Sequence, residues 1–92
     1  MKNLGNLMKQ AQQMQAKMAE MQERLGTIEV TGAAGGGMVQ ATLNGKNELR
    51  RIKIDPTLAD PKEIEVLEDL IVAAVNDARG KVDAATAEEM RQ

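Results

Sequence analysis

Apolar residues recur every three or four positions through the first quarter of the chain. They fall on the a and d positions of three successive heptads, at Leu4, Leu7, Ala11, Met14, Met18, Met21 and Leu25. The residues between them are mostly Gln, Lys, Ala and Glu, which favour helices. The pattern predicts one amphipathic helix over about residues 3–26, roughly 35 Å long. A chain of 92 residues has no core long enough to cover such a rod, so we expect the seam to pack in a helix pair or dimer.

The pattern then changes to the alternation of polar and apolar residues that is typical of half-buried strands. We predict three strands, over about residues 27–32, 37–44 and 47–54. The glycine-rich segment 32–37 would be a flexible connection between the first two. It lacks the spacing and the Lys-Ser/Thr ending of a phosphate-binding loop.

Asn44-Gly45 is a strong signal for a two-residue hairpin, because a type I′ turn needs positive φ at both central residues. With this loop, Val39 faces Arg50, and both Ile52 and Ile54 share the apolar face of Val39. The three strands would therefore form an antiparallel meander.

A second long helix is predicted over about residues 61–88. Asp60-Pro61-Lys62-Glu63 has the residues of a helix start, with Asp as the cap and Pro in the first turn. One face of this helix is apolar, formed by Ile64, Leu67, Ile71, Ala74, Val75, Ala78, Val82 and Ala85. The sequence thus predicts an α+β fold in the order α-β-β-β-α, as a single domain over residues 1–92.

The predicted helices are longer than the predicted sheet. A strand of about 6 residues spans about 20 Å, whereas a helix of about 25 residues spans about 37 Å. The helices should project beyond a small sheet whose two edges are open. A homodimer is the simplest arrangement that covers the apolar seams and the edges.

Composition argues against catalysis. The chain has no Cys, His, Phe, Tyr or Trp, so thiol chemistry, the commonest general base and base-stacking platforms are all missing. The acidic residues of the second helix are interpreted as a solvated face rather than a metal site. We predict no enzyme activity, no cofactor, no metal, no small-molecule substrate and no membrane association, in a protein of the cytoplasm.

Charge is distributed unevenly along the chain. The net charge is −2, yet residues 1–26 carry four basic and two acidic side chains, and residues 61–92 carry four basic and eight acidic ones. Either a solvated surface or binding to duplex phosphates explains the basic positions. The candidate DNA-binding residues are Lys2, Lys9, Lys17, Arg24, Arg50, Arg51, Lys53, Arg79 and Lys81.

The sequence resembles the YbaB/EbfC family of bacterial nucleoid-associated proteins. The resemblance is carried by Leu4-Gly5-Asn6-Leu7-Met8-Lys9-Gln10-Ala11-Gln12-Gln13-Met14-Gln15, and continues through Val30-Thr31-Gly32, Asn44-Gly45, Arg50-Arg51, Ile54-Asp55-Pro56, Leu67-Glu68-Asp69-Leu70-Ile71, Ala73-Ala74 and Asn76-Asp77-Ala78. It implies a tweezer-like homodimer located at the nucleoid, whose projecting helices bind double-stranded DNA and alter its conformation. It also implies a part in nucleoid organisation and gene regulation. The family's usual Gly/Pro/Met-rich tail is not present before Gln92.

The resemblance transfers a DNA-contacting role only to Lys9, which lies in a matched motif on a projecting helix. Arg50-Arg51 match the family as well, but their role could equally be in the structure of the sheet or of the dimer. The remaining basic positions, among them Lys17, Arg24, Arg79 and Lys81, are candidates from charge and position. A different class of function remains open, a helical adaptor that binds another protein through its Met-rich seam, with incidental DNA binding.

Overall fold

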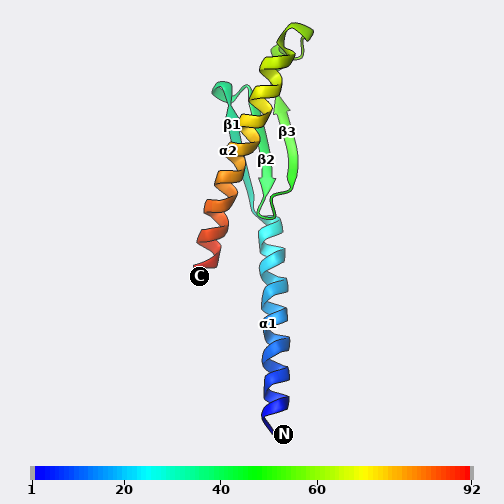
Figure 1. Ribbon diagram of the computed structural model, residues 1–92, viewed down its shortest axis with the longest axis vertical. Coiled ribbons are helices and arrows are strands. Elements are labelled where there is room, and N and C mark those ends of the chain that lie inside the picture. The colour runs from blue at the N-terminus through cyan, green and yellow to red at the C-terminus, as the bar shows by residue number, and fades with distance from the viewer. Residues whose placement is uncertain (1, 92) are drawn as a thin grey trace.

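The computed structural model describes residues 2–91 and has two long helices joined by a three-stranded sheet (Figure 1). Helix α1 spans Lys2–Thr27 and helix α2 spans Ile64–Met90. Between them lie strands β1 (Glu29–Ala34), β2 (Val39–Asn44) and β3 (Leu49–Ile54), in the spatial order β1-β2-β3 and antiparallel throughout. The predicted order of elements is therefore present.

Helix α1 projects from the rest of the molecule as an isolated rod (Figure 1). Its 26 residues correspond to about 39 Å, more than half of the 72 Å long axis. The radius of gyration is 19.6 Å, against about 12 Å for a compact chain of this length. On the exposed seam Leu4, Leu7, Met14 and Met18 keep 59–65% of their surface accessible to solvent.

Helix α2 packs on one face of the sheet and forms the core with it. The buried residues are Val39, Ala41, Leu43, Leu58, Ala74, Ala78 and Val82. Close approach of the helix requires Gly32 on β1, because a Cβ there would lie 2.3 Å from the Ala78 nitrogen and 2.5 Å from the Ala74 oxygen. Helix α2 continues without a break through Gly80.

The predicted hairpin register is wrong. Val39 pairs with Ile54, not with Arg50, and Leu43 pairs with Leu49, with a bulge between Thr42 and Leu43. The predicted face of Ile52 and Ile54 is nevertheless correct, because the pairing of Val39 and Ala41 differs from the prediction by an even number of residues, four. Ile52 lies opposite Ala41 on the face covered by α2.

The turn chemistry explains the error in register. The loop contains residues 45–48, and its one positive φ outside glycine is at Asn47, 63°. Asn44 is buried, and its Oδ1 accepts hydrogen bonds from the Lys46 and Glu48 backbone N–H groups at 2.9 and 3.0 Å. Gly45 serves the packing of α1, because its N–H donates to the Leu25 carbonyl at 2.8 Å and a Cβ would lie 2.4 Å from that oxygen.

Other boundaries differ by a few residues from those predicted. Strand β1 starts at Glu29 and extends into the glycine-rich segment, whose remainder is a 3₁₀ turn with positive φ at Gly35, Gly36 and Gly37. Strand β3 starts at Leu49, after the longer loop. Asp60 caps a 3₁₀ turn over Pro61–Glu63 by accepting from the Lys62 N–H, and α2 proper begins at Ile64.

Candidate nucleic-acid interface

Helix α1 presents two of the candidate cations to solvent. Lys9 and Lys17 are exposed, and within residues 2–91 neither forms an ion pair. Their axial separation is about 12 Å. Lys9 occupies heptad position f, opposite the apolar seam, whereas Lys17 occupies position g beside it. Lys9 therefore stays exposed even when the seam is covered. The side chain of Lys2 lies outside the described part of the chain.

Arg24 is tied to α2. Its Nε lies 3.0 Å from Oε1 of Glu89, near the point where the end of α2 reaches the base of α1 (Figure 1). Met21 and Leu25 on α1, and Ala85 and Glu89 on α2, are half-buried. The end of α2 therefore reaches the last seam positions of α1 and leaves the earlier ones exposed.

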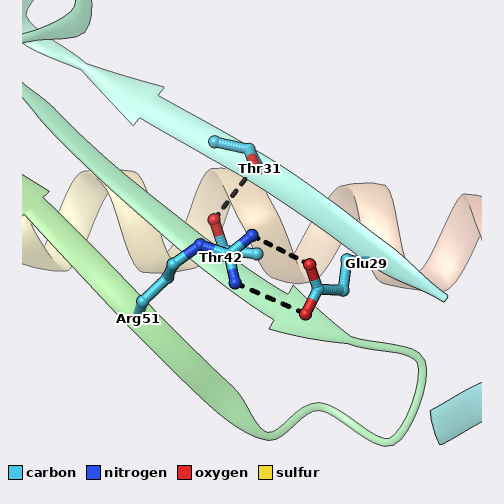
Figure 2. A network of polar contacts seen from close by, with 4 residues as sticks. All are labelled: Glu29, Thr31, Thr42 and Arg51. Carbon is cyan, nitrogen blue, oxygen red and sulfur yellow. Dashed lines mark hydrogen bonds and ion pairs between the residues drawn. The ribbon is translucent and has the colours of Figure 1, made fainter. Parts of the chain in front are cut away.

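Strand β3 carries a second group of cations. Arg50, Arg51 and Lys53 are exposed, but Arg51 already has a partner across the sheet. Its Nη2 donates to Glu29 Oε1 at 2.8 Å, and its Nη1 donates to Oε2 at 3.5 Å (Figure 2). This hydrogen bond and the guanidinium charge lower the pKa of Glu29.

The face of the sheet opposite α2 is polar. Beside the Glu29–Arg51 pair, the hydroxyls of Thr31 and Thr42 are 3.0 Å apart, and the long Arg51 side chain lies across the middle strand (Figure 2). Thr42 is consequently buried, although no other element of the described chain covers this face. The arrangement leaves Arg50 and Lys53 as the cations of β3 without an ion pair among residues 2–91.

Lys81 belongs to the structure of the sheet edge. Its Nζ donates to the Thr31 carbonyl at 2.9 Å and lies 3.5 Å from Asp77, whose Oδ2 accepts from the Ala33 N–H at 3.0 Å. That backbone hydrogen bond, assisted by Lys81, lowers the pKa of Asp77. The two α2 side chains thereby cap the outer edge of β1. Arg79, two residues before Lys81, is exposed and has no ion pair within the described residues.

The structure therefore divides the candidate cations into two groups. Arg24, Arg51 and Lys81 are held by Glu89, Glu29 and Asp77. The described candidates without such partners are Lys9, Lys17, Arg50, Lys53 and Arg79. Sequence reasoning could not find Glu89 and Glu29, because each lies on a different element from its cation, 65 and 22 residues away in the chain. Asp77 lies one helical turn before Lys81, a spacing that favours an ion pair.

Sequence reasoning also missed Lys46. The Lys46 side chain lies against Gly26 at the end of α1. A Cβ added at Gly26 would be 3.5 Å from the Lys46 Cε and 3.8 Å from its Nζ, so the ammonium group lies beside the base of α1. The placement depends on the contact between the β2–β3 turn and α1, and no local pattern encodes that contact.

Two apolar surfaces have no cover within the described chain. One is the α1 seam. The other lies beside β3, because a sheet of three strands is about 14 Å wide and a helix about 10 Å. Helix α2 packs mainly on β1 and β2, while β3 forms the edge of the sheet away from β1, and Ile54 is its residue that packs against the core (Figure 1). Ile52 and Leu49 on β3 and Val72 on α2 remain 38%, 52% and 60% exposed.

The described residues hold no cluster of three or more His, Cys, Asp or Glu side chains that could bind a metal. No pocket is present between residues 2 and 91. Neither of the two long helices is apolar enough over a sufficient length to cross a membrane. The geometry offers surfaces rather than an enclosed site, namely a basic helix, a basic strand and two apolar strips.

Comparisons with known proteins agree with this geometry. A nucleoid-associated protein of Granulibacter bethesdensis is 65% identical over 92 residues, covering 100% of this chain and 86% of the relative. A nucleoid-associated protein of Paramagnetospirillum magneticum is 69% identical over 90 residues, covering 98% of this chain and 84% of the relative. The crystal structure of an uncharacterized protein from Helicobacter pylori matches with a TM-score of 0.75 at 28% identity, covering 95% of this chain and 88% of that one. The predicted α-β-β-β-α fold is thus confirmed. The model of the YbaB/EbfC DNA-binding family matches residues 1–92, and the chain belongs to that family.

Proposed function

We propose that this protein binds double-stranded DNA as a homodimer, mainly through phosphate contacts, alters the conformation of the DNA, and contributes to nucleoid organisation and gene regulation. The observation that carries the proposal is α1, a projecting helix with exposed lysines in a chain of a DNA-binding family. Nucleoid-associated relatives support a location at the nucleoid in the cytoplasm. On this proposal the protein binds DNA and catalyses no reaction, so it needs no cofactor.

Phosphate contact is the mode that the exposed cations favour. They are single Lys and Arg side chains spread over a helix and a strand, with no bidentate set aligned for reading base edges. We therefore expect weak sequence preference and strong dependence on salt. The logarithm of the binding constant should fall with the logarithm of salt concentration by about 0.9 for each phosphate contacted.

The decisive experiment is duplex binding across a salt series with a matched pair of charge reversals. Lys9→Glu with Lys17→Glu removes both exposed lysines of α1. Lys62→Glu with Arg91→Glu gives the same change in net charge at positions outside the candidate set. We expect the α1 variant to lose affinity and have a shallower salt slope, while the control keeps most of both. Equal losses in the two variants would show that only net charge matters.

Homodimerisation is proposed because one further copy would cover both apolar surfaces. Most of the stability of a helix in a protein comes from tertiary packing of its amphipathic face, and most of the α1 seam has no such packing within the described chain. The positions beside the seam fit a self-association that leaves cations available. The e positions Met8, Gln15 and Gln22 carry no acidic group, so they would not neutralise lysines of a second copy. The tweezer-like arrangement, with projecting helices as arms, is part of the same proposal.

Two methionines of similar exposure test this role of the seam. Met14 lies at position d and is 65% exposed, whereas Met8 lies at position e and is 61% exposed. If the seam is the interface, Met14→Gln should remove up to about 2 kcal/mol of apolar burial per copy. The dissociation constant of the dimer, measured by sedimentation, would then rise by up to about a thousandfold, since both copies change. Met8→Gln should have a much smaller effect.

A monomeric wild-type chain would contradict the dimer and favour the adaptor function, in which the same bare seam binds another protein. Capture from nuclease-treated and untreated lysate separates these functions, because a partner that survives nuclease treatment is not bridged by DNA.

A further inference from the structure

The end of α2 meets the base of α1 at a single described ion pair, and this pair involves one of the candidate DNA-binding residues. Arg24 Nε and Glu89 Oε1 are 3.0 Å apart. The other cations of α1 whose side chains are described, Lys9 and Lys17, form no ion pair within the described residues. Glu89 belongs to the acidic α2, and it lies 65 residues from Arg24 in the chain.

The two side chains of the pair differ in their access to solvent. Arg24 remains 55% exposed, while the Glu89 side chain is 26% exposed. The guanidinium thus stays at the surface, and the carboxylate is held in the angle between the two helices. A phosphate could approach Arg24 from solvent, but the carboxylate already occupies part of its donor set.

Arg24 also lies in line with a lysine that has no partner. Seven residues, close to two full turns, separate it from Lys17, so both side chains leave α1 on nearly the same face. Their separation along the axis is about 10 Å. A duplex that contacts Lys17 would therefore bring phosphates to the position of Arg24.

We propose that Glu89 is a positioning residue that withholds Arg24 from DNA, so that the end of α2 sets the affinity of the α1 arm. This inference rests on the proposed DNA binding, and it adds that Glu89 lowers the affinity for DNA. In the wild-type protein Arg24 stays with Glu89 and contributes little to the salt dependence. Removing the carboxylate charge makes Arg24 available as one further phosphate contact in each copy.

Glu89→Gln tests the inference, because it keeps the shape and removes the charge. Asp83→Asn is the matched control. It removes one charge from the same helix, at an exposed residue without an ion pair in the described chain. Each protein is titrated with a duplex between about 0.05 and 0.3 M salt.

The expected result is tighter binding and a steeper salt slope for Glu89→Gln than for Asp83→Asn. Each additional contact steepens the slope by about 0.9, which equals about an eightfold change in affinity per tenfold change in salt, so a dimer that gains one contact in each copy would show a slope steeper by about 1.8. The gain should require Arg24, so Glu89→Gln combined with Arg24→Gln should bind like Arg24→Gln alone. A merely structural role for Glu89 would lower stability and would not steepen the slope.

Two results would overturn the inference while leaving the proposed function intact. One is the same affinity and slope for Glu89→Gln and Asp83→Asn, and the other is a gain that persists without Arg24. A wild-type chain that fails to bind duplex DNA at any of these salt concentrations would instead refute the proposed function, and the inference with it.

Discussion

Replacement of Gly32 by Ala should destabilise the fold more than any other single-methyl addition in the sheet. A Cβ at this position would lie 2.3 Å from the Ala78 nitrogen, 2.5 Å from the Ala74 oxygen and 2.7 Å from the Ala78 Cα. All three atoms belong to the backbone of α2, so no side-chain rotation relieves the overlap. Helix α2 would have to move away from β1 by about 1 Å to reach ordinary contact distances.

The size of the destabilisation can be estimated from the core contacts that a movement of α2 away from the sheet would weaken. The core lies between α2 and the sheet and includes Val39, Leu43, Ala78 and Val82. A gap of 0.5–1 Å forfeits about a quarter to a half of each dispersion contact across it. Overpacking a core typically costs about 1–3 kcal/mol, and we expect a cost near the upper limit because both sides are backbone. For a domain of this size that corresponds to a fall in Tm of about 12–24 °C.

Thermal unfolding followed by circular dichroism measures this effect at a fixed protein concentration, since association also shifts Tm. Gly80→Ala is the control. A Cβ at Gly80 meets nothing within 4 Å, and the residue lies inside α2. It should stabilise the helix by about 1 kcal/mol, as alanine does relative to glycine. If Gly32→Ala unfolds within a few degrees of wild type, the close packing of α2 on β1 is not as described.

Two further outcomes are expected. Gly45→Ala should destabilise the junction of α1 with the sheet by about 1–3 kcal/mol, because its Cβ would lie 2.4 Å from the Leu25 oxygen, and denaturant unfolding would detect the loss. Stability should also fall as pH drops below about 4, because the pKa of Asp77 and of Glu29 is lowered in the folded state and the unfolded chain therefore binds protons more readily in that range. Asp77→Asn, which can still accept the Ala33 hydrogen bond, should weaken this pH dependence in thermal unfolding measured from pH 6 to pH 2.5.

Periodicity alone was enough to predict the elements and the faces of this fold. The heptad seam predicted α1, and alternation placed Ile52 and Ile54 on the side of Val39, where they are found. The predicted hairpin register was wrong because Asn44-Gly45 can occur for a reason other than a two-residue turn. Here Asn44 bonds to its own loop, and Gly45 leaves room for the carbonyl of Leu25. Tertiary contact, rather than a turn with positive φ, explains the glycine.

The candidate interface was less predictable than the fold, because ion pairing is a long-range property. Arg51 and Glu29 are brought together by strand pairing, and Arg24 and Glu89 by the return of α2 to the base of α1. Neither pair has a sequence signature. The exception is Lys81, whose partner Asp77 lies one helical turn earlier, a spacing that favours an ion pair on any helix.

The net charge of −2 does not oppose DNA binding by α1, because the charges are separated along an elongated molecule. Glu63, Glu65, Glu68 and Asp69 are at the start of α2, at the end of the molecule opposite the tip of α1 (Figure 1). The long axis measures 72 Å, whereas exposed charges are largely screened beyond about 8–10 Å at physiological salt. A phosphate beside Lys9 is therefore attracted by the lysine and scarcely repelled by this acidic group. By contrast, Glu89 of α2 is near enough to Arg24 of α1 to form an ion pair, with Nε and Oε1 3.0 Å apart. On the proposed mode of binding, we therefore expect local pairing, rather than total charge, to decide which cations are available to DNA.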